Sequence, residues 1–218
     1  MRVVVGMSGG VDSGVTALLL KRAGHDVVGV TMRLWKEGRY AGGTRDACFG
    51  PGEADDIESA KAMAERLGIE YHVVDCSDAY EREIVSYFRE ASRAGLTPNP
   101  CVICNVRIKF GLLPEMASAS GIRFDRFATG HYARVADRGG RMALLRAVDR
   151  RKDQSYFLYR LSQEQFARQM FPLGELCKRE VREIAASAGL AAAERPDSQD
   201  FYSGTGTSSW AFRTGLAT

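Results

Sequence analysis

The chain has 218 residues, a length that fits one large α/β domain, alone or with a small appendage. Its 45% of apolar and 26% of charged residues are ordinary for a globular protein, and its net charge of +3 restricts any nucleic-acid interface to a local patch. No apolar run approaches the roughly 18 residues of a membrane span, so we expect no membrane partner.

The first predicted element is a buried parallel strand over residues 3–5, followed by a turn rich in glycine and serine and by a helix over residues 14–22. Gly9 and Gly10 let the backbone approach a ligand closely, and the first amides of the helix present the positive end of its dipole. The pattern predicts a phosphate-binding turn. The alternative is a Gly-rich turn that binds no ligand.

This turn lacks the lysine of G-x-x-x-x-G-K-[ST] and does not match G-x-G-x-x-G. The string Ser8-Gly9-Gly10-Val11-Asp12-Ser13 instead resembles the PP-loop of ATP pyrophosphatases. That resemblance implies that the loop holds the pyrophosphate of ATP while a substrate oxygen attacks the α-phosphate. It also implies that Gly6, Met7 and the six loop residues bind ATP with Mg²⁺, and that Asp12 is catalytic.

Strands and helices then alternate along the chain. The hydrophobic pattern predicts strands over residues 27–32 and 69–75 and helices over residues 53–67 and 80–94. We therefore expect a doubly wound parallel sheet that binds its ligand at the carboxyl edge. Residues 36–52 are predicted to form a mobile loop over that edge, and its Cys48 is either an unpaired surface thiol, a thiol relay or a metal ligand.

A C-x-x-C follows, formed by Cys101 and Cys104 at the start of a predicted helix. The helix dipole and the nearby charges of Arg107 and Lys109 would stabilise a thiolate there, so we expect an activated thiol. Taken alone, the motif fits a redox pair, half of a zinc site or part of an iron–sulfur site. No second C-x-x-C or Cys/His pair completes a zinc site.

Later in the chain, residues 124–131 are predicted to form a strand that reaches the same carboxyl edge, and residues 134–146 a β-hairpin. Helical segments are predicted over residues 164–167 and 176–188, the second ending at Gly189.

Several strings in this order resemble the tRNA-specific 2-thiouridylases, which belong to the PP-loop class. The strings are Thr97-Pro98-Asn99-Pro100-Cys101-Val102-Ile103-Cys104-Asn105, Ile108-Lys109-Phe110, Ala128-Thr129-Gly130-His131-Tyr132-Ala133-Arg134, Lys152-Asp153-Gln154-Ser155-Tyr156-Phe157-Leu158 and Pro196-Asp197-Ser198-Gln199-Asp200. The resemblance covers residues 1–204 and implies a PP-loop, adenine nucleotide alpha hydrolase-like fold with a small helical appendage.

It also implies an ATP-dependent tRNA sulfurtransferase, which adenylates a uridine carbonyl and replaces its oxygen with sulfur to form 2-thiouridine. Cys104 matches the nucleophile, and Cys101 occupies a position that is Asp in some members and Cys in others. Met32 and Gly130 match positions that contact the adenine nucleotide. The positions expected to contact tRNA are Asn99, His131, Lys152, Asp153 and Gln154. For His131, a structural imidazole is the alternative.

Two features depart from this family. Tyr202 stands where the family has a second, persulfide-carrying cysteine, and a phenol cannot carry sulfane sulfur. An irregular tail stands where members commonly continue into β-rich domains.

Two hypotheses explain how sulfur could be transferred without the second cysteine. One hypothesis is that Cys101 resolves a Cys104 persulfide as a disulfide. The rival hypothesis is an iron–sulfur cluster on Cys101 and Cys104, with Cys48 as a third ligand or with one iron left open.

We therefore divide the chain into a nucleotide-binding α/β domain (1–150), a helical segment that contacts tRNA (151–204) and an irregular tail (205–218). The expected partners are tRNA and a sulfur donor, either a protein or sulfide. A cytoplasmic location is expected, because the N-terminus leads directly into a core strand and leaves no room for a signal peptide. The alternative functions are a PP-loop amide ligase that adenylates a small molecule and an inactive nucleotide- or tRNA-binding module.

Overall fold

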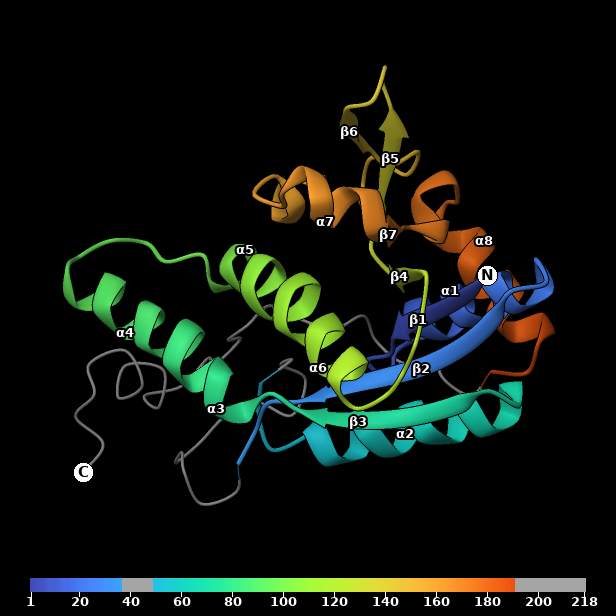
Figure 1. The fold of residues 1–218 in the computed structure, drawn as a ribbon, viewed down its shortest axis with the longest axis horizontal. Coiled ribbons are helices and arrows are strands. Elements are labelled where there is room, and N and C mark those ends of the chain that lie inside the picture. The colour runs from blue at the N-terminus through green and yellow to red at the C-terminus, as the bar shows by residue number, and fades with distance from the viewer. Residues whose placement is uncertain (37–48, 191–218) are drawn as a thin grey trace.

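The computed structural model describes residues 1–36 and 49–190, and its centre is a five-stranded parallel sheet (Figure 1). The strand order is β3-β2-β1-β4-β7, and every neighbouring pair is parallel. The strands are β1 (Arg2–Gly6), β2 (Asp26–Arg33), β3 (Glu70–Asp75), β4 (Arg126–Thr129) and β7 (Gln169–Met170). The predicted doubly wound α/β fold is confirmed.

The run of valines in β1 explains why the sheet is covered on both faces. Val3 and Val5 pack on one side with the helices α1 (Val11–Arg22), α2 (Glu53–Leu67) and α8 (Lys178–Ser187). Val4 points to the opposite side, into a core with Phe110. Because successive side chains of a strand alternate between faces, a strand with all three valines fully buried must lie between two layers.

The second layer consists of two long helical runs, which lie together in green in Figure 1. The first contains α3 (Ser77–Tyr80), the π-helical η1 (Glu81–Val85) and α4 (Ser86–Arg93). The second contains α5 (Pro100–Cys104), the π-helical η2 (Asn105–Leu112) and α6 (Leu113–Ala119). The helix expected over residues 80–94 therefore begins earlier, and the helix at the C-x-x-C continues for about five turns.

Beyond β4 the chain forms the predicted hairpin and then several short elements. The hairpin joins β5 (Ala133–Asp137) to β6 (Met142–Arg146) and projects from the molecule (Figure 1). The short elements are η3 (Ser155–Leu158), α7 (Gln163–Arg168) and η4 (Pro172–Glu175). The strand expected over residues 124–131 is shorter, because pairing with β1 ends at Thr129 and the chain then leaves the sheet.

Residues after 150 contribute to both the sheet and a helical layer. β7 pairs with β4, and α8 contacts α1. The predicted boundary at residue 150 stays a prediction. Cys48, the string 196–200, Tyr202 and the tail 205–218 lie outside the described residues, as does most of the predicted mobile loop. In the part of the chain that is described, no helix combines the length and apolar character needed to cross a membrane.

Candidate functional site

A cavity of about 320 Å³ opens at the carboxyl ends of β1, β2 and β4. Its walls include many of the residues expected to bind nucleotide or RNA: Gly6, Met7, Ser8, Asp12, Ser13, Met32, Gly130, His131, Lys152 and Gln154. The volume lies in the range of pockets that hold small-molecule ligands. The structure therefore brings residues from both predicted sets to one place.

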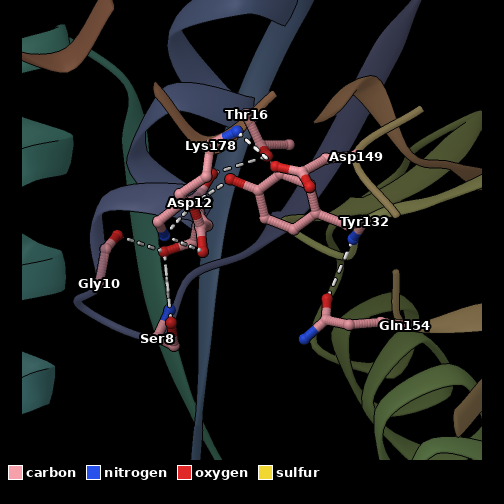
Figure 2. Close-up of polar contacts among 9 residues, drawn as sticks. Ser8, Gly10, Asp12, Thr16, Tyr132, Asp149, Gln154 and Lys178 are labelled. Atoms are coloured by element: carbon pink, nitrogen blue, oxygen red, sulfur yellow. Dashed lines mark hydrogen bonds and ion pairs between the residues drawn. The ribbon is translucent and has the colours of Figure 1, made fainter. Parts of the chain in front are cut away.

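The loop before α1 is held in shape by its own polar groups (Figure 2). The hydroxyl of Ser13 accepts a hydrogen bond from the Ser8 amide at 3.1 Å and donates one to the Gly10 carbonyl at 3.0 Å. The hydroxyl of Thr16 donates to the carbonyl oxygen of Asp12 at 2.8 Å. Ser13 is therefore almost fully buried at the start of α1, and it lines the cavity together with Ser8 and Asp12.

Two glycines allow the close packing around this loop. Gly9 has a φ of +76°, and a β-carbon there would collide with the backbone carbonyl of Asp56 on α2. A β-carbon at Gly130 would lie 2.9 Å from the Ser13 amide nitrogen. Val11, by contrast, is buried in the core and does not line the cavity. The glycines thus bring the start of α1 against α2 and against the segment that follows β4.

The side chain of Asp12 is bound by two residues from distant parts of the chain (Figure 2). The Lys178 ammonium nitrogen lies 2.8 Å from each carboxylate oxygen, and the Tyr132 hydroxyl donates to one of them at 2.9 Å. The Lys178 side chain is only 10% exposed. The backbone amide of Lys178 donates to the Asp149 carboxylate at 3.0 Å, which fixes the start of α8 beside the loop.

The sequence analysis did not identify Lys178, Tyr132 or Asp149 as site residues. The position of Lys178 at the start of a helix is a sequence signal for such a contact. A cation there faces the positive end of the helix dipole and needs a compensating anion. That anion is Asp12, which is 166 positions away in the sequence. The ion pair also places a positive charge beside this loop, which lacks the lysine of the G-x-x-x-x-G-K-[ST] motif.

His131 lies in the cavity wall, where its ring packs in a cluster with two aromatic rings. Its ring centroid is 5.5 Å from that of Phe110 and 6.2 Å from that of Phe171, and its Nδ1 is 2.8 Å from the Thr129 hydroxyl. Burial holds the pKa of His131 well below its usual value, and the positive charge of Lys109 lowers it further. The imidazole is therefore neutral at pH 7 and faces the cavity as a hydrogen-bonding group.

The three residues of the run Lys152-Asp153-Gln154 have two different environments: two line the cavity, and the third is hydrogen-bonded within its own turn. Lys152 and Gln154 line the cavity, and the Gln154 amide oxygen accepts from the Tyr132 amide at 3.0 Å. Asp153 accepts hydrogen bonds from the Ala147 amide at 2.8 Å and the Ser155 hydroxyl at 2.9 Å. Burial opposes its ionisation, but these hydrogen bonds outweigh burial and lower the pKa of Asp153. These contacts shape the turn, and the tRNA contact of Asp153 stays a prediction.

The C-x-x-C lies in α5, and both thiols are half-buried against the core. The expected tRNA contact Asn99 is the residue that caps this helix, because its side-chain oxygen accepts from the Val102 amide at 3.3 Å. Neither cysteine lines the cavity, but the same helical run places Lys109 in its wall.

Within the part of the chain that the structure describes, Cys101 and Cys104 have no further ligands for an iron–sulfur cluster. Among residues 1–36 and 49–190, no group of three or more His, Cys, Asp or Glu side chains is arranged to hold a metal ion. A cluster needs three or four protein ligands, so Cys101 and Cys104 alone do not fit one. The proposed third ligand, Cys48, lies outside the described residues.

Known proteins resemble this chain over most of its length. Residues 1–202 match a family model described as the tRNA methyl transferase HUP domain. The tRNA-specific 2-thiouridylase MnmA of Endomicrobium trichonymphae is 48% identical over 94% of this chain and 58% of its own length. That of Treponema denticola is 49% identical over 92% of this chain and 53% of its own length. The chain thus spans about half the length of the curated relatives it matches.

Solved structures support the fold. A 4-thiouridine synthetase, solved as an RNA complex with bound ATP, has a TM-score of 0.58 at 16% identity, over 89% of this chain and 42% of that one. An NMN synthetase from Francisella tularensis has a TM-score of 0.50 at 18% identity, over 89% of this chain and 64% of that one. At these identities the likeness concerns the fold alone.

Proposed function

The chain belongs to the tRNA methyl transferase HUP domain family, and on that basis we propose that it is an ATP-dependent tRNA sulfurtransferase that forms 2-thiouridine. The relatives named tRNA-specific 2-thiouridylase support this activity, since their identity extends over more than nine-tenths of the chain. The observation that carries the proposal is the single cavity in which the PP-loop meets His131, Lys152 and Gln154.

In this proposal the cavity binds ATP as a substrate. The amides at the start of α1 and the Ser8 hydroxyl hold the pyrophosphate, while Met32 and Gly130 contact the adenosine. Mg²⁺ is commonly bound by one or two carboxylates together with substrate phosphates. Asp12, the only carboxylate among the described residues that line the cavity, would hold it. Lys178 balances the charge of Asp12 and keeps it oriented.

The C2 carbonyl oxygen of uridine attacks the α-phosphate of ATP, and the bond to pyrophosphate breaks. The carbonyl oxygen is then part of a good leaving group. Sulfur attacks C2, and AMP departs with the original carbonyl oxygen. If sulfide is the donor, it supplies the sulfur and releases its proton to solvent.

If the sulfur is instead carried as a persulfide, its terminal sulfur on Cys104 attacks C2. The thiolate of Cys101 then attacks the sulfur of Cys104, which releases the thiolated uridine and leaves a Cys101–Cys104 disulfide. A dithiol reductant must then reduce that disulfide before the next turnover. The spacing of the two residues within one turn of α5 is compatible with this step.

The fate of the carbonyl oxygen tests the proposal. We expect tRNA labelled with ¹⁸O at the C2 carbonyl of uridine to give AMP that carries one ¹⁸O, because the oxygen that attacks phosphorus leaves with AMP. Mass spectrometry of the released AMP measures this transfer. Unlabelled AMP from the same reaction would contradict the adenylation of uridine.

A further inference from the structure

Two exposed tyrosines lie in the segment that follows the cavity residue Gln154. Tyr156 is 63% exposed and Tyr159 is 60% exposed, and their ring centroids are 6.0 Å apart with the ring planes at 35°. Single exposed apolar side chains are normal on proteins. Two large aromatic rings gathered on one surface are less usual, and we call them the tyrosine pair.

The tyrosine pair is held in a fixed position relative to both the cavity and the cysteines. Leu158, between the two tyrosines, is fully buried in the core. The Asn105 side chain donates a hydrogen bond to the Phe157 carbonyl at 3.1 Å, and Asn105 directly follows Cys104. The Gln154 amide donates to the Tyr132 carbonyl at 2.8 Å. The rings are thus exposed although the backbone beneath them is anchored on two sides.

The surroundings of the tyrosine pair favour a polyanion. Arg150 and Arg151 are exposed shortly before the tyrosine pair in the chain, and the exposed Arg160 directly follows Tyr159. Asp149 and Asp153 keep their negative charges while they accept hydrogen bonds from backbone amides. Four basic residues outnumber these two acidic ones over residues 149–160. The net charge of the chain is only +3, so this is a local concentration of positive charge.

A uridine whose carbonyl reaches the cavity must leave its base stack, and its neighbours then lose a stacking partner as well. Unpaired RNA bases are bound by stacking on aromatic side chains and on arginine planes, with phosphates held by basic groups. We propose that the tyrosine pair is a stacking platform for unpaired tRNA bases next to the target uridine. This inference rests on the proposed function, since it assumes a tRNA substrate at the cavity.

The test measures the affinity of wild-type protein and of the Y156A/Y159A variant for two RNAs, one a hairpin with the target uridine in its loop, the other a duplex with the same number of phosphates. Each stacked base contributes an affinity factor of roughly five to 150. We expect the variant to lose at least about fivefold in hairpin affinity, with an unchanged salt dependence and unchanged duplex affinity. Y156F/Y159F should bind as the wild type does, because phenyl rings also stack.

Val73→Ala is the matched control, since Val73 is an exposed apolar residue on β3, at the sheet edge opposite β7. Equal hairpin binding by wild type and Y156A/Y159A would overturn this inference and leave the proposed function intact. If the Y156A/Y159A variant keeps its hairpin affinity but no longer accepts sulfur from a donor protein, the tyrosine pair binds that protein instead. That result would also overturn the inference. A wild type that binds neither RNA would overturn the proposed function and the inference together.

Discussion

The carboxylate of Asp12 receives hydrogen bonds from the Tyr132 hydroxyl and the Lys178 ammonium, and it faces a cavity suited to a nucleotide. Pyrophosphate would bring further negative charge to the same place. Lys178 should therefore contribute more to the affinity for a ligand that carries the β- and γ-phosphates than to the affinity for one that lacks them. Its side chain is largely shielded from solvent, so the interaction is weakly screened.

Lys178→Met should weaken ATP binding about tenfold or more, while AMP binding changes little. A hydrogen bond to a charged group contributes roughly 1.5–3 kcal/mol, and the variant removes this cation from beside the loop. Isothermal titration calorimetry at fixed ionic strength measures both affinities. Lys61→Met, an exposed lysine on α2, is the control. Equal losses for ATP and AMP would indicate a purely structural role for Lys178.

Sequence reasoning at the level of single residues identified the loop but not its partners. The string from Ser8 to Ser13 and the residues Gly130 and His131 are recognisable because their motifs are local. The contacts of Asp12 with Lys178 and Tyr132 depend on how α8 and the segment after β4 pack against α1, which no local pattern specifies. Asp153 is a different case, because its hydrogen bonds from the Ala147 amide and the Ser155 hydroxyl are local to its turn, and the resemblance had assigned it to tRNA instead.

Among the elements, α8 depends on an acidic side chain that lies outside it. Asp149 accepts from the Lys178 amide at 3.0 Å and from the Arg151 amide at 3.0 Å. A carboxylate at a helix N-terminus satisfies an amide that the helix leaves unpaired and interacts favourably with the helix dipole. The hydrogen bond from the Lys178 amide is the main cause of the lowered pKa of Asp149. The position of Lys178 in the site therefore depends on this contact.

Asp149→Asn should lower the melting temperature at pH 7, and the difference from the wild type should shrink as the pH falls below the usual carboxylate value of 3.8. Because the pKa is lower in the folded state, the stabilisation is present above the unfolded value and is lost as the pH falls through the folded value. Calorimetry from pH 7 to pH 3 measures this, with Glu58→Gln on α2 as the control. A difference that does not change with pH would contradict the assignment.

The sequence predicts helices and strands where the hydrophobic pattern is long. It does not predict them where tertiary contacts determine the type and length of the element. The end of α2 is predicted by Gly68, which adopts a φ of +60° as a left-handed cap. β7 has only two residues, too few for any periodicity. The π-helical η2 depends on contacts from α7, since the Gln165 side chain donates to the Val106 carbonyl at 2.9 Å and the Phe110 carbonyl at 3.1 Å.

At the scale of the whole molecule, both ends of the described chain build the candidate site. The loop comes from the first strand–helix unit, and its lysine comes from α8, the last helix among residues 1–36 and 49–190. The doubly wound architecture follows from the apolar strands, which require cover on both faces. The likeness to an NMN synthetase concerns the fold alone and does not support the amide ligase alternative.

We propose that the protein replaces a uridine oxygen with sulfur at the expense of ATP. Nucleoside mass spectrometry of tRNA incubated with the protein, Mg²⁺-ATP and a sulfide source tests it most directly. We expect 2-thiouridine with the wild type, in amounts that match the AMP released, and neither product with Asp12→Ala. AMP released without sulfur in the tRNA, or thiolation that proceeds without ATP, would contradict the claim.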